Sequence, residues 1–255
     1  MDDPIRQSRT EVVRKKISNS LTGHAKTGEV MLKSMVMAMG ASLFAAPYLH
    51  HLLSLSVTLA DPMSGMGLYG FLLMELFLLF VLSLLCSMAG FSFAERRGLP
   101  GLGVWPAFVK DLPLLFIMGL VFITLSIFLF DRRFQEISPS SYPQDLFYLA
   151  MFPFKGAFTD EVILRLGLVT IGAGLFRHRA AGVVFAALLA LCFSMKYFQF
   201  TGIDMNVTSI ILPHIFLTLL INVFLGYLFV TRGLFYAMGM NFILKLKYVV
   251  IACAL

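Results

Sequence analysis

The sequence predicts an all-α, polytopic transmembrane helical bundle of about seven spans. Hydrophobic residues make up 59% of the chain and charged residues only 13%, and the mean hydropathy is +0.87. A soluble domain of this length would carry about 25% charged residues. The apolar residues also gather into runs of about 20 residues, the length that crosses a bilayer as a helix. The chain is therefore expected to form one membrane-embedded bundle and not a soluble domain.

Residues 1–28 are polar and basic, and we expect them to form an N-terminal segment outside the single transmembrane bundle of residues 29–255. Basic residues beside a first span stay on the cytoplasmic side. The N-terminus is therefore expected in the cytoplasm, and the expected location is the inner membrane of a bacterium. The segment fits either a short helix on the membrane surface or a disordered basic tail. Its basic residues are Arg6, Arg9, Arg14, Lys15 and Lys16.

Seven apolar stretches follow, separated by loops rich in Gly, Pro or charged residues. Pro47 in the first stretch, and Pro153 with Gly156 in the fourth, predict kinked helices. The fourth stretch is longer than one straight crossing, so we expect a tilted or kinked helix there. The stretches cover approximately residues 30–57, 67–94, 112–130, 145–176, 180–199, 207–230 and 233–254.

The net charge of +6 does not indicate nucleic-acid binding, because the basic residues cluster beside apolar runs. Cys86, Cys192 and Cys253 lie inside apolar runs without a CxxC pair, and we expect them to be buried and inert. His50 and His51 point about 100° apart on a helix and cannot readily share a metal. We therefore predict no metal and no cofactor, with membrane lipids and other membrane protein subunits as partners.

The stretch FTDEVILR, residues 158–165, places two acids and an arginine inside an apolar run. Each ionisable group at bilayer depth costs between about 2.5 and more than 10 kcal/mol, so it needs a partner, a hydrated cavity or a chemical role. Glu161 and Arg165 are four residues apart with the acid first, which favours an ion pair on one helix face. Asp160 points about 100° away from Glu161 and would need a partner from another helix.

Later spans carry polar residues that could serve Asp160. Lys196 and Tyr197 lie in the fifth stretch, and Asn241 and Lys245 lie four residues apart in the seventh. We expect each of them to lie well within its span and not at an end. A lysine at that depth costs less when it faces an acid. We predict a structural ion-pair network of five residues: Asp160, Glu161, Arg165, Lys196 and Lys245.

Three motifs carry a family resemblance: D-E-x-x-x-R at residues 160–165, F-x-x-x-Y at residues 193–197, and LGYLFVTRGLFYAMGMNFILK at residues 225–245. They resemble the motifs of the CAAX protease and bacteriocin-processing (CPBP) family of intramembrane glutamic endopeptidases. That family has Glu-Glu-x-x-x-Arg, Phe-x-x-x-His and His-x-x-x-Asn on successive helices. The resemblance covers residues 150–247 and implies a CPBP-like core there.

In that family the first carboxylate works with histidines to activate water for attack on a peptide carbonyl, and His and Asn stabilise the oxyanion. The resemblance puts Asp160 and Glu161 at the two glutamates and Arg165 at the arginine. It puts Tyr197 and Asn241 at the two histidines. If the protein is active, these five residues are its implied catalytic set.

Lys245 stands at the family's asparagine, where it would hold a carboxylate in an ion pair. Each lost acid/base group or oxyanion donor costs about 10²–10⁴ in rate, and both histidines are replaced.

The first hypothesis is therefore a catalytically inactive protein of the CPBP fold, an accessory or assembly subunit or a partner-binding protein. The alternative is an active endopeptidase that cleaves membrane-anchored or prenylated peptides, with Asp160 or Glu161 as base. His214 would restore activity only if its helix turned toward the site. A proton or ion path is a third possibility that no inverted repeat supports.

Overall fold

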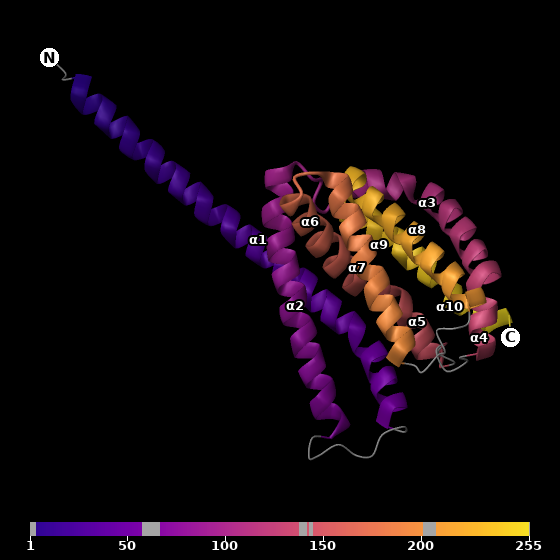
Figure 1. The fold of residues 1–255 in the computed structure, drawn as a ribbon. Helices are drawn as coiled ribbons and strands as arrows, with labels where there is room; N and C mark the ends of the chain where they lie inside the picture. The colour runs from indigo at the N-terminus through magenta and orange to yellow at the C-terminus, as the bar shows by residue number, and fades with distance from the viewer. Residues whose placement is uncertain (1–3, 58–66, 138–141, 143–144, 201–207, 255) are drawn as a thin grey trace.

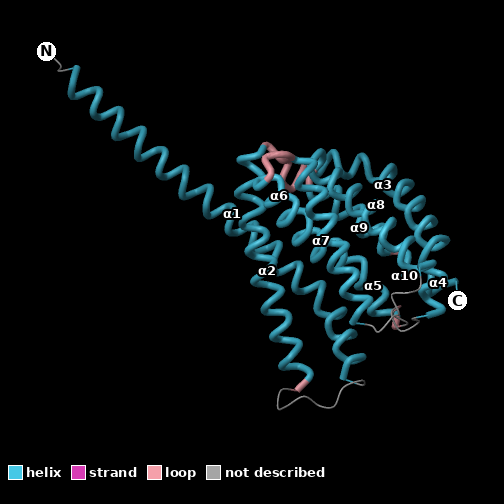
Figure 2. The backbone as a smooth tube through the Cα atoms, in the orientation of Figure 1, coloured by secondary structure: helices cyan, strands magenta, loops and turns pink. Residues whose placement is uncertain are grey.

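The computed structural model describes residues 4–57, 67–137, 142, 145–200 and 208–254, with side chains described for residues 27–53, 67–137, 142, 145–196 and 210–252. All regular structure within these ranges is helical (Figure 2). The label η marks π-helical turns, whose backbone hydrogen bonds join residues five apart. The elements are α1 (Pro4–Val57), α2 (Leu68–Arg97), α3 (Trp105–Ser126), η1 (Ile127–Asp131), α4 (Arg132–Ile137), α5 (Leu146–Lys155), η3 (Gly156–Asp160), η4 (Val162–Val169), α6 (Thr170–Leu175), α7 (Arg179–Phe200), α8 (Thr208–Arg232), α9 (Leu234–Lys245) and α10 (Lys247–Ala254).

Six helices among the described residues are long and apolar enough to cross a membrane, so the chain is a helical membrane protein. The predicted count of about seven spans is corrected to six. The stretch at residues 145–176 is not among the six, because it is divided into the shorter segments α5, η3, η4 and α6. The six spans are Thr27–Leu53, Leu68–Arg97, Trp105–Ile137, Arg179–Lys196, Ile210–Arg232 and Leu234–Ala252.

The segments from α5 to α6 follow one another directly and run through the middle of the bundle (Figure 1). They pack against α1, α2, α7 and α9. From residue 151 to residue 174, only Ile171 is exposed. The surrounding helices shield this charged stretch from lipid, which allows it to lie at the centre of an apolar bundle. We call it the central segment, residues 146–175.

The N-terminal segment is helical, as one of the two expectations had it, but it is not a separate helix. α1 continues from Pro4 to Val57, and its first half projects away from the bundle (Figure 1). No proline lies between Pro4 and Pro47, so no residue in this range removes a helical hydrogen bond. The first span is thus an uninterrupted continuation of the basic segment.

Helix α9 lies against the central segment, and the span that α9 begins, Leu234–Ala252, is the most deeply buried of the six. Half of its span is buried, against 17–28% in the other five. It begins after Gly233, whose φ of +106° only glycine adopts without strain. The backbone N–H of Leu234 donates to the carbonyl oxygen of Gly101 at 2.9 Å, which satisfies one of the free amides of the helix start. This anchor positions Asn241 two turns along the helix, opposite the central segment.

The structure shows the surroundings of two of the cysteines and of His50. Cys86 is buried, as expected, but Cys192 is exposed, and the side chain of Cys253 lies outside the described residues. On a membrane span, an exposed thiol faces lipid, which is as apolar as the protein core. His50 Nδ1 lies 2.8 Å from the hydroxyl of Tyr148, so this histidine joins α1 to α5.

Candidate functional site

Glu161 and Arg165 form a buried ion pair on the central segment. Glu161 Oε2 lies 3.2 Å from Arg165 Nε, and their side chains are 0% and 1% exposed. Asn241 on α9 donates from Nδ2 to Glu161 Oε1 at 2.7 Å and to the carbonyl oxygen of Gly156 at 2.9 Å. The structure therefore brings together three residues that the sequence singled out, and the amide of Asn241 ties α9 to the central segment.

Asn222 on α8 is a member of this cluster that sequence reasoning missed. Its Oδ1 accepts a hydrogen bond from Arg165 Nη2 at 2.7 Å, and its Nδ2 donates to the carbonyl oxygen of Thr218 at 2.8 Å. Arg165 Nη1 has no hydrogen-bond partner among the described residues. The spacing of His214, Thr218 and Asn222 at intervals of four was the available signal, because it places all three on one face of a helix.

Asp160 pairs with Lys155, not with Lys245 or Lys196 as predicted. Lys155 Nζ donates to Asp160 Oδ1 at 2.7 Å, and the two side chains are 19% and 24% exposed. Residues five apart lie about 140° from each other on an α-helix. The π-helical turn η3 spans the residues between them, and its five-residue hydrogen-bond spacing brings them to the same face.

Lys245 lies beside Gly156 without an ion pair to any described residue. Its Nζ lies 5.5 Å from the ring centroid of Phe152 and 5.9 Å from that of Tyr248. A Cβ on Gly156 would come within 2.8 Å of the Lys245 side chain. Glycine at this position therefore allows α9 to approach the central segment closely.

Of the two predicted site residues on α7, Lys196 does not join the cluster. Lys196 is exposed near the end of α7. It makes no ion pair or hydrogen bond with a described residue, which removes it from the predicted network. Tyr197 follows it in the same helix, and its side chain lies outside the described residues.

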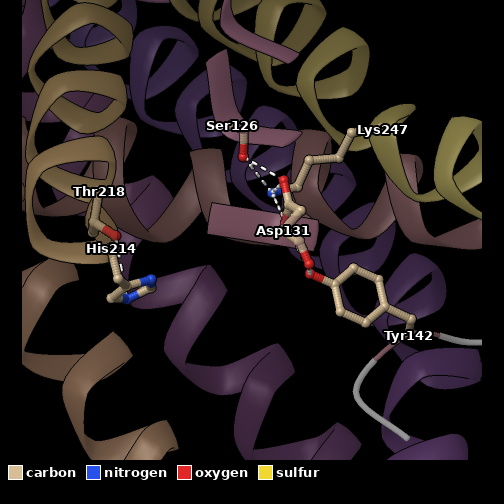
Figure 3. Close-up of polar contacts among 6 residues, drawn as sticks. All are labelled: Ser126, Asp131, Tyr142, His214, Thr218 and Lys247. Atoms are coloured by element: carbon tan, nitrogen blue, oxygen red, sulfur yellow. Dashed lines mark hydrogen bonds and ion pairs between the residues drawn. The ribbon is translucent and has the colours of Figure 1, made fainter. Parts of the chain in front are cut away.

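A second buried ion pair, between Asp131 and Lys247, was not predicted. Lys247 Nζ lies 2.8 and 2.9 Å from the two carboxylate oxygens of Asp131, whose side chain is 1% exposed (Figure 3). The hydroxyls of Ser126 and Tyr142 also donate to this carboxylate, at 2.5 and 2.9 Å. Ser126 and Asp131 are again five residues apart, across the π-helical turn η1.

His214 lies near this second pair (Figure 3), and Asp131 and Lys247 are its charged neighbours. Its Nε2 makes hydrogen bonds with the hydroxyls of Ser194 at 2.5 Å and Thr218 at 3.3 Å. Its ring packs 5.0 Å from the ring of Phe130. These contacts join α7, α8 and the end of the third span, which gives His214 a structural role between helices.

The chemistry open to the Glu161 cluster is limited by its partners. A general base must reach water or a substrate proton within hydrogen-bond distance. Glu161 is fully buried, and its carboxylate already contacts Arg165 and Asn241. Asp160 is partly accessible but paired with Lys155. Among the described residues, no three His, Cys, Asp or Glu side chains come together as metal ligands would.

Comparisons of the chain with protein-family models, with curated proteins and with solved structures found no match.

Proposed function

We propose that this protein is a catalytically inactive membrane protein with a CPBP-like core that serves as an accessory or assembly subunit and binds another membrane protein. We place it in a bacterial inner membrane, with the N-terminus in the cytoplasm. The observation that supports this most directly is the pairing of both adjacent acids. Glu161 is fully buried against Arg165 and Asn241, and Asp160 is bound by Lys155.

The residue types around the cluster support an inactive centre. The two positions that carry histidines in the CPBP family hold Tyr197 and Asn241 here. Asn241 uses both of its amide hydrogens, one for Glu161 and one for the backbone of Gly156. An amide that is fully occupied in joining two helices has no hydrogen left to donate to an oxyanion. The cluster thus works as a connection between α9 and the central segment.

The alternative, an endopeptidase for membrane-anchored or prenylated peptides, has one observation in its favour. The Asp160 side chain is 24% exposed, so the acid that stands at the position of the family's first glutamate is not fully enclosed by the bundle. Release of Lys155 would then be needed before Asp160 could accept a proton.

A peptidase assay separates the two functions. Purified protein in liposomes should leave a prenylated reporter peptide intact, at a rate equal to that of the Asp160→Asn variant. Asparagine retains a carbonyl oxygen for Lys155, so this variant keeps the local contact while losing the base. Cleavage by the wild type that Asp160→Asn abolishes would replace the proposal with the alternative.

Assembly is tested separately, by isolating the tagged protein from its own membrane in a mild detergent. We expect a second membrane protein at a fixed stoichiometry, retained in the Asp160→Asn and Tyr197→Phe variants, because binding requires the fold and not the acid. A wild-type chain that purifies alone after cross-linking in the membrane would contradict the accessory role.

A further inference from the structure

Among the residues whose side chains the structure describes, the charges in the interior around α9 are not balanced. Asp131 pairs with Lys247, Asp160 with Lys155, and Glu161 with Arg165. Each acid of this region therefore has its own cation. Lys245 is the further cation, and it has no carboxylate partner among the described residues.

Lys245 is the last residue of α9, but it lies in the middle part of the span Leu234–Ala252, so its side chain cannot simply extend into water beyond an end of that span. The aromatic rings of Phe152 and Tyr248 compensate its charge in part, through cation–π attraction. Its other charged neighbours, Asp131 and Asp160 with their lysines, are already neutralised as pairs. A cation in this environment favours the uptake of an anion.

A cavity of about 80 Å³ lies beside Lys245, between α3, α8, α9 and α10. Its polar lining consists of Ser126, Asn241, Lys245 and Lys247, and its remaining walls are apolar side chains of α3, α8 and α9. Since one water molecule occupies about 30 Å³ of liquid, this volume holds two or three waters or one anion of a few heavy atoms.

We infer that this cavity is a binding site for a small, singly charged anion, such as formate, nitrate or chloride, or the carboxylate of a lipid. Lys247 already directs its three N–H donors at Ser126 and Asp131, so Lys245 is the group that would hold the anion. This inference is independent of the proposed function, because an active or an inactive protein would bind the anion equally.

The chemistry of the lining selects the charge of the ligand. Half of the lining residues are apolar, so an entering ion loses much of its hydration. The attraction of one unpaired lysine can offset the desolvation free energy of an anion with one negative charge, but not that of an anion with two. Sulfate and other divalent anions should therefore bind weakly, and gluconate should be too large for the cavity.

Thermal unfolding of the purified protein in a nonionic detergent tests the site. Sodium formate is titrated against sodium gluconate at constant ionic strength, with sodium sulfate as a second reference. We expect formate to raise the apparent Tm in a saturable manner by about 3 °C, and sulfate to have no comparable effect. Lys245→Met should abolish the rise. Lys196→Met, which removes the same charge from the exposed surface of α7, should retain it.

Equilibrium dialysis of radiolabelled formate with the wild type covers the case in which Lys245→Met does not fold. We expect about one formate per chain, displaced by nitrate but not by gluconate. Protection by oleate that requires Lys245, in the absence of protection by formate, would assign the site to a lipid carboxylate. An equal response of Lys245→Met, or no saturable binding of either formate or oleate to the wild type, would overturn the inference.

Discussion

Glu161 and Asp131 are the two fully buried carboxylates in the described part of the chain, and they are neutralised in different ways. Glu161 pairs with Arg165 four residues later on the same segment, and neither side chain is accessible. Asp131 pairs with Lys247, which comes from another helix 116 residues later and is 16% exposed. The first pair is local and rigidly enclosed, whereas the second is a contact between distant helices whose lysine reaches the protein surface.

The two centres also differ in how completely their hydrogen bonds are satisfied. Asp131 accepts from Ser126, Tyr142 and Lys247. In the other centre, Arg165 Nη1 has no hydrogen-bond partner among the described residues, and its Nε faces Glu161 in ion-pair contact without hydrogen-bond alignment. A buried charge that has few other hydrogen-bond partners costs more free energy when its ion-pair partner is removed. The Glu161 centre should therefore tolerate mutation less well than the Asp131 centre.

The largest effect is expected for Glu161→Ala. It leaves the guanidinium of Arg165 buried and unpaired, which should lower the free energy of unfolding by about 3–5 kcal/mol. Glu161→Gln should cost less, because its amide oxygen can still accept from Asn241. Unfolding in mixed micelles measures the change, with the exposed Glu136→Ala as control. If Glu161→Ala costs no more than Glu136→Ala, the buried pair does not stabilise the fold.

A smaller loss, of about 3 kcal/mol or less, is expected for Asp131→Ala, because the partly exposed Lys247 can move toward the surface. Lys247→Met should cost a similar amount, and the double variant should cost clearly less than the sum of the two. The same unfolding measurement gives this coupling energy. Additive losses would contradict the direct pairing and with it the comparison of the two centres.

The smallest effect, within about 1 kcal/mol, is expected for Asp160→Asn, because both side chains of its pair with Lys155 are partly exposed and the asparagine oxygen can still accept from Lys155. Double-mutant cycles measure the coupling energy between Asp160 and each candidate lysine, and so identify its partner. Asp160 should couple measurably to Lys155 and less to Lys245. A stronger coupling of Asp160 to Lys245 would favour the pairing predicted from the sequence over the one in the structure.

Helical periodicity explains which part of the candidate site could be predicted. Glu161 and Arg165 have the i, i+4 spacing that an ordinary α-helix brings together, and they form the expected ion pair even though Arg165 lies in the π-helical segment η4. Lys155 and Asp160 are five apart, a spacing that an α-helix separates by about 140°. Only the π-helical turn between them makes the pair possible. The same applies to Ser126 and Asp131 across η1.

The span count was wrong for a related reason. Residues 145–176 are apolar enough to be read as a span, but the structure divides them into two α-helices with two π-helical turns between them. Lys196 lies within an apolar stretch but is exposed, so the position of a residue within such a stretch does not decide which way its side chain points.

The sequence by itself determined that this protein is a helical membrane protein and that Glu161 meets Arg165, because composition and four-residue spacing act locally. Only the tertiary structure decided that Lys247 reaches Asp131, that Lys155 serves Asp160, and that Lys245 is left beside a small cavity. These contacts depend on how helices pack and where π-helical turns rotate a helix face. Neither property is encoded in the pattern of any single stretch.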